Sequence, residues 1–321
     1  MTSAAASPSR LMLLDSASMY FRAFHGVPDT ITAPDGTPVN AVRGFLDMIS
    51  TLISMRRPAR LVACWDDDWR PAFRVAAIPS YKAHRLAHPG AAAEQTPPTL
   101  DAQIPVIVEV LAAFGIARVG AAGMEADDVI GTLATRDAAR AVPGGPADVD
   151  VVTGDRDLFQ LVDDDAGIRV LYLGRGLRNL ETVDVARLGE KYAVASGQAY
   201  ADLAVLRGDP SDGLPGVAGI GEKTGSALIA RYGDLAGLMA AVRDGDVALS
   251  AGNAKKLTAA ADYLAVAPTV VQVVRDAPIP PVDDALPATP ADPDALLALA
   301  DRWGIESSLS RLVQSLAAVH P

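Results

Sequence analysis

Acidic side chains provide the clearest candidate chemistry in this chain. They occur in short groups, in the stretches EADD (125–128), GDRD (154–157) and GDPSD (208–212). Taken singly, such groups are explained by helix capping or by the helix dipole. Taken together they favour Mg²⁺ or Mn²⁺, because these ions prefer carboxylate ligands and because crowded acids repel one another unless cations lie between them. The sequence therefore predicts metal-dependent phosphoryl or phosphodiester chemistry.

Other catalytic patterns are missing from the sequence. The chain holds 4 histidines and has neither a G-x-S-x-G nor an H-E-x-x-H motif. His84 and His88 have the i, i+4 spacing of a metal-binding pair, but no acid lies between them and no third ligand is evident. This pattern favours a solvated or phosphate-neighbouring role over zinc. The single cysteine, Cys64, lies in the apolar run LVAC and is predicted to be a buried core thiol.

The glycine-rich stretch PGVAGIGEKTG, residues 215–225, nearly matches a P-loop. Gly216 and Gly221 fit the spacing, but Glu222 stands where the motif requires lysine, and Lys223 follows one residue late. A P-loop also follows a buried strand directly, and GDPSDGLP is not strand-like. The stretch is therefore interpreted as a turn between two helices, and a P-loop nucleotidase is disfavoured.

The elements expected in the first half place acids at one edge of a sheet. Buried strands are predicted in RLMLLDSAS, RLVACWDDD, DVDVVTGD and IRVLYL, and helices over 40–54, 101–114 and 125–140. This alternation indicates an α/β fold with a mostly parallel, doubly wound sheet and helices on both faces. Three strands end in Asp15, Asp66 and Asp155. Because ligands of such sheets gather at the carboxyl ends of the strands, we expect these carboxylates to converge.

The chain changes character near residue 185, where short helices begin to alternate with glycine-rich turns. A division into an α/β core, residues 1–187, and a helical region, residues 188–321, is predicted. Within the first part, residues 79–98 are polar, rich in proline and alanine, and poorly periodic. A long excursion of this kind inside a compact domain is typical of a functional segment.

The composition limits the partners and the cellular compartment that the protein can have. The net charge of −11 does not exclude nucleic acid, because acids gathered at a metal site lower the total without describing the local charge. One cysteine excludes an intramolecular disulfide and fits a reducing cytoplasm. No apolar run approaches the roughly 18 residues of a membrane span. A soluble, cytoplasmic protein without a membrane partner is expected.

Several stretches, in the same order, resemble the 5′-nuclease or flap endonuclease family, in particular the 5′→3′ exonuclease domain of bacterial DNA polymerase I and its stand-alone relatives. They are LLDSASMYFRAFHGVP, NAVRGFLDMI, VACWDDDWRPAFR with PSYKAHR, MEADDVIGTLA, VVTGDRDLFQLV and LRGDPSDGLPGVAGIGEKTG. The resemblance implies a PIN/FEN-like core, a helical arch at about residues 79–100, and a C-terminal helical region with a helix–two-turn–helix DNA-binding element at about 200–232. A stand-alone enzyme is expected, because no polymerase portion follows.

The resemblance also implies ligands to two or three divalent ions, Mg²⁺ or Mn²⁺. These ligands are Asp15, Asp66 or Asp67, Glu125, Asp127, Asp128, Asp155, Asp157, Asp209 and Asp212. At the second strand both alternatives stay open, since strand continuity favours Asp66 and the spacing to Arg74 favours Asp67. Gly213 departs from the family, which usually has asparagine at this position.

The resemblance assigns further residues to DNA. Tyr81, Lys82 and Arg85 match the YKxxR motif at the base of the arch. Lys82 and Arg85 are expected to hold the scissile phosphate, and Tyr81 to offer its ring to an unpaired base. The glycine turn is expected to approach duplex phosphates through backbone N–H groups, with K⁺ bridging backbone oxygens to a phosphate. The other residues expected to contact DNA are Arg22, Arg43, Arg74, Gly219, Gly221, Lys223 and Thr224.

The implied function is that of a structure-specific 5′→3′ exonuclease or flap endonuclease. It would hydrolyse phosphodiesters near 5′ single-strand/duplex junctions with two metal ions, in primer removal, replication and repair. Expected partners are DNA molecules with 5′ flaps, nicks or RNA-primed 5′ ends, while polymerase or ligase partners are not readable from the sequence. The alternative is a non-catalytic DNA-junction-binding protein on the same fold, which absent acids would indicate; every matched acid is present.

Overall fold

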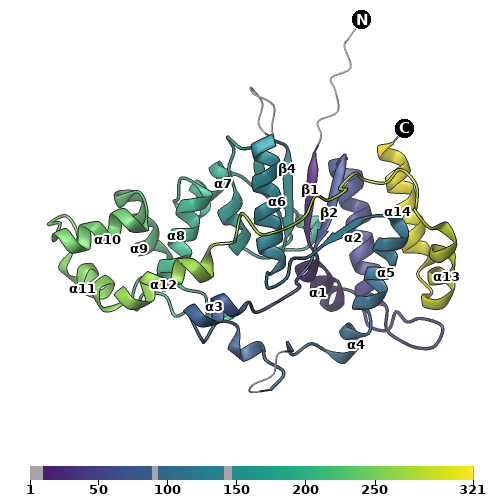
Figure 1. Cartoon of the computed structure of the whole chain (residues 1–321), viewed down its shortest axis with the longest axis horizontal. Coiled ribbons are helices and arrows are strands. Elements are labelled where there is room, and N and C mark those ends of the chain that lie inside the picture. Colours follow the sequence, from purple (N-terminus) through teal and green to yellow (C-terminus); the bar gives the residue numbers. More distant parts are fainter. Residues whose placement is uncertain (1–9, 89–92, 141–146, 321) are drawn as a thin grey trace, which may run out of the picture.

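The computed structural model describes residues 10–88, 93–140 and 147–320, which fold around a six-stranded sheet (Figure 1). The strands lie in the order β3-β2-β1-β4-β5-β6, and every neighbouring pair is parallel except β5 and β6. Their bounds are β1 Leu11–Asp15, β2 Arg60–Cys64, β3 Ala117–Val119, β4 Val149–Thr153, β5 Ile168–Tyr172 and β6 Glu181–Val183. The predicted fold class is confirmed. Strands β3 and β6 were not predicted, because so few residues carry no readable hydrophobic period.

Side chains of β1 point alternately to the two faces of the sheet. Leu11 and Leu13 pack in one hydrophobic cluster with residues of α6, whereas Met12 and Leu14 pack in the other with residues of α2. The bounds of the core helices are α1 Ser16–Gly26, α2 Asn40–Arg56, α5 Ile104–Phe114 and α6 Ala126–Arg140. Because both faces are covered, the ends of the strands are the places left open to a ligand.

The helix predicted over 101–114 is divided into α4 Pro98–Asp101 and α5. Pro105 lies in the first turn of α5, where a missing N–H group leaves no helical bond unmade. Between the two helices, the buried side chain of Gln103 accepts a hydrogen bond from the backbone N–H of Ala41 at 2.8 Å. The interruption therefore caps the start of α2.

The second half of the chain forms a helical lobe beside the sheet, drawn in green in Figure 1. Its bounds are α7 Val185–Tyr192, α8 Gly197–Arg207, α9 Glu222–Tyr232, α10 Leu235–Asp244, α11 Ala251–Ala259 and α12 Ala261–Val271. The stretch KKLTAAADYLAV is divided between α11 and α12 at Ala260.

The chain then returns to the sheet, where α13 Pro293–Trp303 and α14 Glu306–Val319 pack on the far side from the lobe (Figure 1). Leu312 of α14 is buried in the same cluster as Phe45 of α2. Arg311 forms an ion pair with Asp47 of α2 at 2.7 Å. The last two helices therefore cover the core. The division at 187/188, which assigns them to the helical region, stays a prediction.

The segment between β2 and α5 runs past the ends of the strands (Figure 1). It contains α3 Ala72–Ala77 and a short 3-10 turn, η1 Ala83–Arg85; further such turns are η2 Asp157–Leu161, η3 Leu177–Asn179 and η4 Pro210–Asp212. Of the arch predicted at 79–100, residues 89–92 lie outside the described residues. No helix within the described ranges has the length and apolar character to cross a membrane.

Candidate active site

Carboxylates from separate elements surround a cavity of about 210 Å³ at the ends of the parallel strands. Asp15 is the last residue of β1, and Asp66 and Asp155 follow the ends of β2 and β4. Glu125 and Asp127 come from the start of α6. The convergence of Asp15, Asp66 and Asp155 is as the strand pattern predicted, because parallel strands end at one edge of the sheet.

Glu94 is a further carboxylate on the cavity wall that sequence reasoning did not single out. It lies in the proline- and alanine-rich excursion, outside every matched motif. The chain turns back toward the cavity because the N–H of Gln95 donates to the carbonyl oxygen of Arg85 at 2.7 Å. The signal that could have found Glu94 was an acid within a segment already expected to line the site.

Burial and mutual repulsion govern the charge of the cavity carboxylates. Asp15 accepts hydrogen bonds from the Thr153 hydroxyl at 2.6 Å and the Ser18 N–H at 3.1 Å, yet burial raises its pKa to about 7. Burial also raises the pKa of Asp127, and the charges of Asp15 and Asp155 raise it further. Carboxylates that repel one another in this way are stabilised by a cation between them.

A second group of acids, Asp157, Asp209 and Asp212, also lies near Asp155. Burial raises the pKa of Asp157, and the charges of Asp155, Asp212 and Asp209 add to this effect. Asp212 is buried and accepts a hydrogen bond from Arg85 at 2.6 Å. Strand β4 ends before Asp155, and Asp157 begins the 3-10 turn η2. The acids thus form two groups that share Asp155.

The structure separates Asp66 from Asp67, between which the sequence left the choice open. Asp66 lines the cavity and accepts a hydrogen bond from the N–H of Ala126 at 2.8 Å. Asp67 is exposed, and its carboxylate lies against Gly120. Asp66 is therefore the acid of this pair that faces the cavity.

Arg74 and Asp128 form a buried ion pair outside the cavity. Arg74 is 2% exposed, and its guanidinium donates to Asp128 at 2.6 Å and to Glu125 at 2.7 Å. Asp128 is fully buried and also accepts from the N–H of Val274. The expectations that Arg74 contacts DNA and that Asp128 binds a metal are therefore corrected, since neither side chain lines the cavity. The apolar run PAFRVAAI around Arg74 was the signal of burial.

Tyr81 is also buried, with 3% of its surface exposed, and its hydroxyl donates to Glu125 at 2.8 Å. Its ring is not available to stack on a base, which corrects that expectation. Lys82 has a left-handed φ of 48°, and its ammonium donates to the same carboxylate. Lys82 and Arg85 both line the cavity, and their role at a phosphate stays a prediction.

The base of the predicted arch closely approaches the GDPSD turn. The Ser80 hydroxyl donates to the carbonyl oxygen of Gly213 at 2.8 Å, and the Lys82 N–H donates to that of Asp212 at 2.9 Å. Gly213 has a φ of 73°, and a Cβ there would collide with the carbonyl oxygen of Ser80. Glycine, where the family usually has asparagine, therefore permits the close approach.

Two other arginines expected at DNA are bonded within the protein. Arg22 donates to the carbonyl oxygen of Gly154 at 3.0 Å, next to the cavity. Arg43 donates to the hydroxyl of Ser307 at 3.3 Å, between α2 and α14. Their contacts with DNA stay predictions.

The glycine turn joins α8 to α9, as the helix–turn–helix interpretation required. Gly221 is the residue that caps α9, followed by the exposed Lys223 and the half-buried Thr224. Gly219 has a φ of 76°, and its carbonyl oxygen accepts a hydrogen bond from the ammonium of Lys256 at 2.9 Å. The turn therefore already has a cation of the chain at one of its carbonyl groups.

The cavity carboxylates are the side chains that could hold a divalent ion. Across residues 10–88, 93–140 and 147–320, no group of three or more acids, histidines or cysteines is arranged to hold a metal ion. The carboxylates are engaged by donors of the protein, as Glu125 is by Tyr81 and Lys82. Their chemistry, all carboxylate oxygen, fits a hard cation, so binding one requires Glu125 to exchange partners.

Comparison with known proteins decides the family. Residues 10–193 match the N-terminal resolvase-like domain of the 5′-3′ exonuclease, and residues 195–294 match its C-terminal SAM fold. The chain belongs to the 5′-3′ exonuclease family. As the sequence predicted, it is a nuclease, an enzyme that hydrolyses phosphodiester bonds.

Relatives of this nuclease are found both alone and within polymerases. The 5′-3′ exonuclease of Streptomyces coelicolor is 59% identical over 96% of this chain and 100% of its own length. DNA polymerase I of Mycobacterium tuberculosis is 37% identical over 99% of this chain and 34% of the polymerase. The solved structure of phage T5 D15 flap endonuclease in a complex with DNA and metal ions is 17% identical, with a TM-score of 0.61 over 97% of this chain and 98% of that one. This likeness shows the shared fold.

Proposed function

We propose that this nuclease is a structure-specific 5′→3′ exonuclease and flap endonuclease that cuts phosphodiesters near 5′ single-strand/duplex junctions. The observation that carries the proposal is a cavity in which carboxylates from the strand ends and α6 face two cationic side chains, Lys82 and Arg85. Acids alone would repel a phosphodiester, whereas a wall of both signs admits a phosphate and the cations that accompany it. In the phage T5 flap endonuclease, the same fold holds DNA and metal ions together.

We propose that two or three divalent ions, Mg²⁺ or Mn²⁺, bind the two acid groups. When bound, such ions activate a water and stabilise the leaving oxygen of the phosphodiester. The residues that would hold them are Asp15, Asp66, Glu125, Asp127, Asp155, Asp157, Asp209 and Asp212. Asp155 belongs to both groups, and its carboxylate is exposed at the cavity, so it is the ligand whose loss affects both groups at once.

The contribution of the chain itself is to place cations where the phosphate must lie. The Lys82 ammonium is held by Glu125, and the Arg85 guanidinium by Asp212. Each cation is therefore fixed before the substrate arrives, and little side-chain entropy is lost when a phosphate binds. Because both come from the segment past the strand ends, a strand entering beneath that segment meets both of them.

Duplex DNA is proposed to lie along the glycine turn, with the backbone N–H groups after Gly221 and the ammonium of Lys223 at its phosphates. K⁺ is not included at this turn, because the Gly219 carbonyl already accepts a hydrogen bond from Lys256. DNA with 5′ flaps, nicks or RNA-primed 5′ ends is the partner that this arrangement suits, in primer removal, replication and repair.

The test is cleavage of 5′-labelled flap, nicked and blunt duplexes with Mg²⁺ or Mn²⁺, with product sizes mapped. Asp155→Ala and Asp157→Ala should lose cleavage by at least a hundredfold while keeping junction binding measured without divalent ions. Asp165→Ala is the matched control, since Asp165 is exposed and does not line the cavity. A second readout is thermal: Mg²⁺ should raise the melting temperature of the wild-type protein and raise that of Asp155→Ala less.

Two results would contradict the proposal. Full cleavage by both variants would show that the acids are not part of the reaction. Junction binding by the wild-type protein without cleavage under any divalent ion would favour the alternative, a non-catalytic DNA-junction-binding protein on the same fold.

A further inference from the structure

Two exposed arginines lie on the loop between β5 and β6. The loop, GRGLRN, covers residues 174–179 and contains Arg175 and Arg178. Within the part of the chain that the structure describes, neither guanidinium forms a hydrogen bond or an ion pair. Glu181 of β6 interacts electrostatically with Arg175, but its carboxylate is paired with Arg187 at 2.6 Å. The loop therefore offers two guanidinium groups to an anion from outside the protein.

The loop begins at the edge of the sheet where the carboxylates converge. Strand β5 runs parallel to β4, so it ends at the edge where Asp155 follows β4. The guanidinium of Arg22 joins the two places: it donates to the carbonyl oxygen of Gly154 at 3.0 Å and to that of Gly174 at 3.5 Å. Gly154 lines the active-site cavity. The first residue of the loop is thus separated from the cavity wall by a single arginine side chain.

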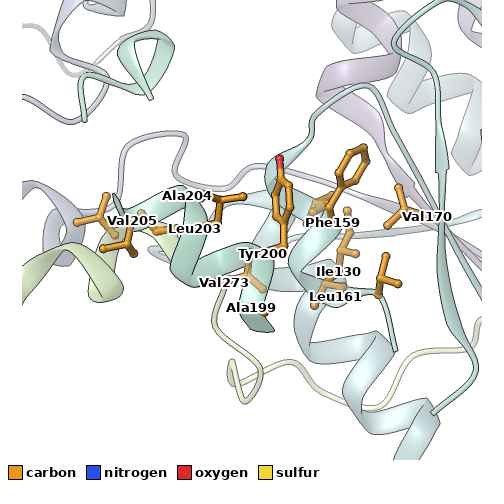
Figure 2. Packing of buried hydrophobic residues seen from close by; sticks show 14 of the residues in the cluster. Ile130, Phe159, Leu161, Val170, Ala199, Tyr200, Leu203, Ala204, Val205 and Val273 are labelled. Atoms are coloured by element: carbon orange, nitrogen blue, oxygen red, sulfur yellow. The ribbon is translucent and has the colours of Figure 1, made fainter. Parts of the chain in front are cut away.

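The strand that carries the loop is fixed in the core. Figure 2 shows Val170 of β5 next to Phe159, and both are buried in the same hydrophobic cluster. The ring of Tyr172, the last residue of β5, packs edge to face on Phe159 at 5.1 Å. Leu177 of the loop packs against the other cluster, which contains residues of α1 and α2. Packing on both faces of the sheet therefore sets the position of the loop.

Hydrogen bonds within the loop hold its shape. The N–H of Gly176 donates to the carbonyl oxygen of Leu173 at 2.8 Å, and the side-chain amide of Asn179 donates to that of Arg175 at 3.2 Å. Gly176 has a φ of 78°, which favours glycine, and a Cβ there would meet nothing within 4 Å. The backbone of the loop is therefore ordered before a ligand arrives, which lowers the entropic cost of binding.

A backbone phosphate of DNA is the anion that suits this position. A guanidinium donates two parallel hydrogen bonds to phosphate oxygens and offsets the phosphate charge. The cations already placed at the cavity, Lys82 and Arg85, are held by Glu125 of α6 and Asp212 of the helical lobe. The loop instead packs on the α1 and α2 face. A DNA strand at the strand ends would therefore meet cations from two different parts of the protein.

We propose that Arg175 and Arg178 form a second phosphate-binding site, which holds a backbone phosphate of the DNA substrate beside the active-site cavity. The inference rests on the proposed function, since it names a further contact with the same substrate. The two arginines are positioning residues. They hold the DNA strand next to the carboxylates and do not take part in bond cleavage.

The test is flap-DNA binding in EDTA by the double variant Arg175→Gln, Arg178→Gln. Each lost charge should weaken binding roughly threefold to tenfold at low salt and reduce the slope of log affinity against log salt by about one. The double variant Arg175→Lys, Arg178→Lys should keep the wild-type slope, because the slope counts charges. Arg302→Gln, an exposed residue of α13 on the far side of the core, is the control and should change neither quantity.

Two further readouts separate this role from a structural or catalytic one. The melting temperature of the Gln variant should equal that of the wild-type protein, because neither guanidinium has a hydrogen bond or ion pair to lose within the described residues. In cleavage with Mg²⁺, its KM should rise while kcat stays unchanged, since the arginines do not touch the reacting atoms.

The inference and the proposed function can fail separately. Wild-type affinity and salt slope in the Gln variant would overturn the inference, and so would an equal loss of slope in the Lys variant. If this happened while Asp155→Ala lost cleavage, the proposed function would stand. If the wild-type protein neither bound nor cut flap DNA, the proposed function would fail and the inference with it.

Discussion

Replacing Arg74 by methionine should destabilise the protein severely without removing a contact with DNA. Arg74 is 2% exposed and lies between two buried carboxylates, 2.6 Å from Asp128 and 2.7 Å from Glu125. Methionine keeps much of the side-chain volume but leaves both acids without their cation. Removing one member of a buried ion pair typically costs about 3–5 kcal/mol, chiefly because the remaining charge stays buried and unpaired.

The remaining partners set the size of the effect. Glu125 keeps Tyr81 and Lys82, and Asp128 keeps the N–H groups of Glu125 and Val274. These donors offset part of the loss, so we expect a decrease of about 4 kcal/mol in the free energy of unfolding. For a chain of this size that corresponds to a melting temperature lower by about 10 °C.

The assay is denaturant unfolding of Arg74→Met, Asp128→Asn and the double variant, with Arg302→Met as an exposed control. The double variant should lose less than the sum of the single variants, because the second change removes the charge that the first left unpaired. In EDTA below its melting temperature, Arg74→Met should bind flap DNA with the wild-type salt dependence. Near-normal stability together with a smaller salt slope would refute the burial argument and restore Arg74 as a phosphate contact.

Three further predictions concern sites away from the cavity or at its margin. Asp150 is fully buried and paired with Arg56 at 2.8 Å and Arg169 at 2.6 Å, so Asp150→Asn should lower the free energy of unfolding by about 3–5 kcal/mol. Cleavage per folded molecule should be unchanged, and a loss of cleavage would show that this ion pair is coupled to the active site. Gly213→Ala should lower the melting temperature and slow cleavage, because its Cβ would displace Ser80 and with it Lys82; Gly252→Ala, with open space around it, should be harmless, and equal behaviour of the two would contradict this reasoning. Duplex binding should be the same in KCl and NaCl at one ionic strength and weaker in Lys256→Met, since Lys256 supplies the cation at the Gly219 carbonyl; a tenfold preference of the wild-type protein for K⁺ would disprove it.

Local pattern was sufficient for the acids that end strands. Asp15, Asp66 and Asp155 follow buried apolar runs, and parallel strands must end at one edge, so their convergence follows from the sequence. The glycine turn was also readable, because the register of Lys223 excluded a P-loop and helical stretches flanked it. Charge pairs between distant segments could not be predicted, as Arg74 and Asp128 show. Each matched a functional motif, but the two side chains form a buried ion pair with each other.

The sequence by itself therefore determined the class of fold, the family, and which carboxylates stand at the strand ends, since these depend on periods and spacings within single elements. Tertiary structure alone decided which cations remain near the cavity, that Asp66 and not Asp67 faces it, and that Glu94 joins its wall. It also decided that α13 and α14 cover the core. The physical reason is that a buried charge is stabilised by an opposite charge from another segment of the chain. Which segments come into contact is decided by packing across the whole chain.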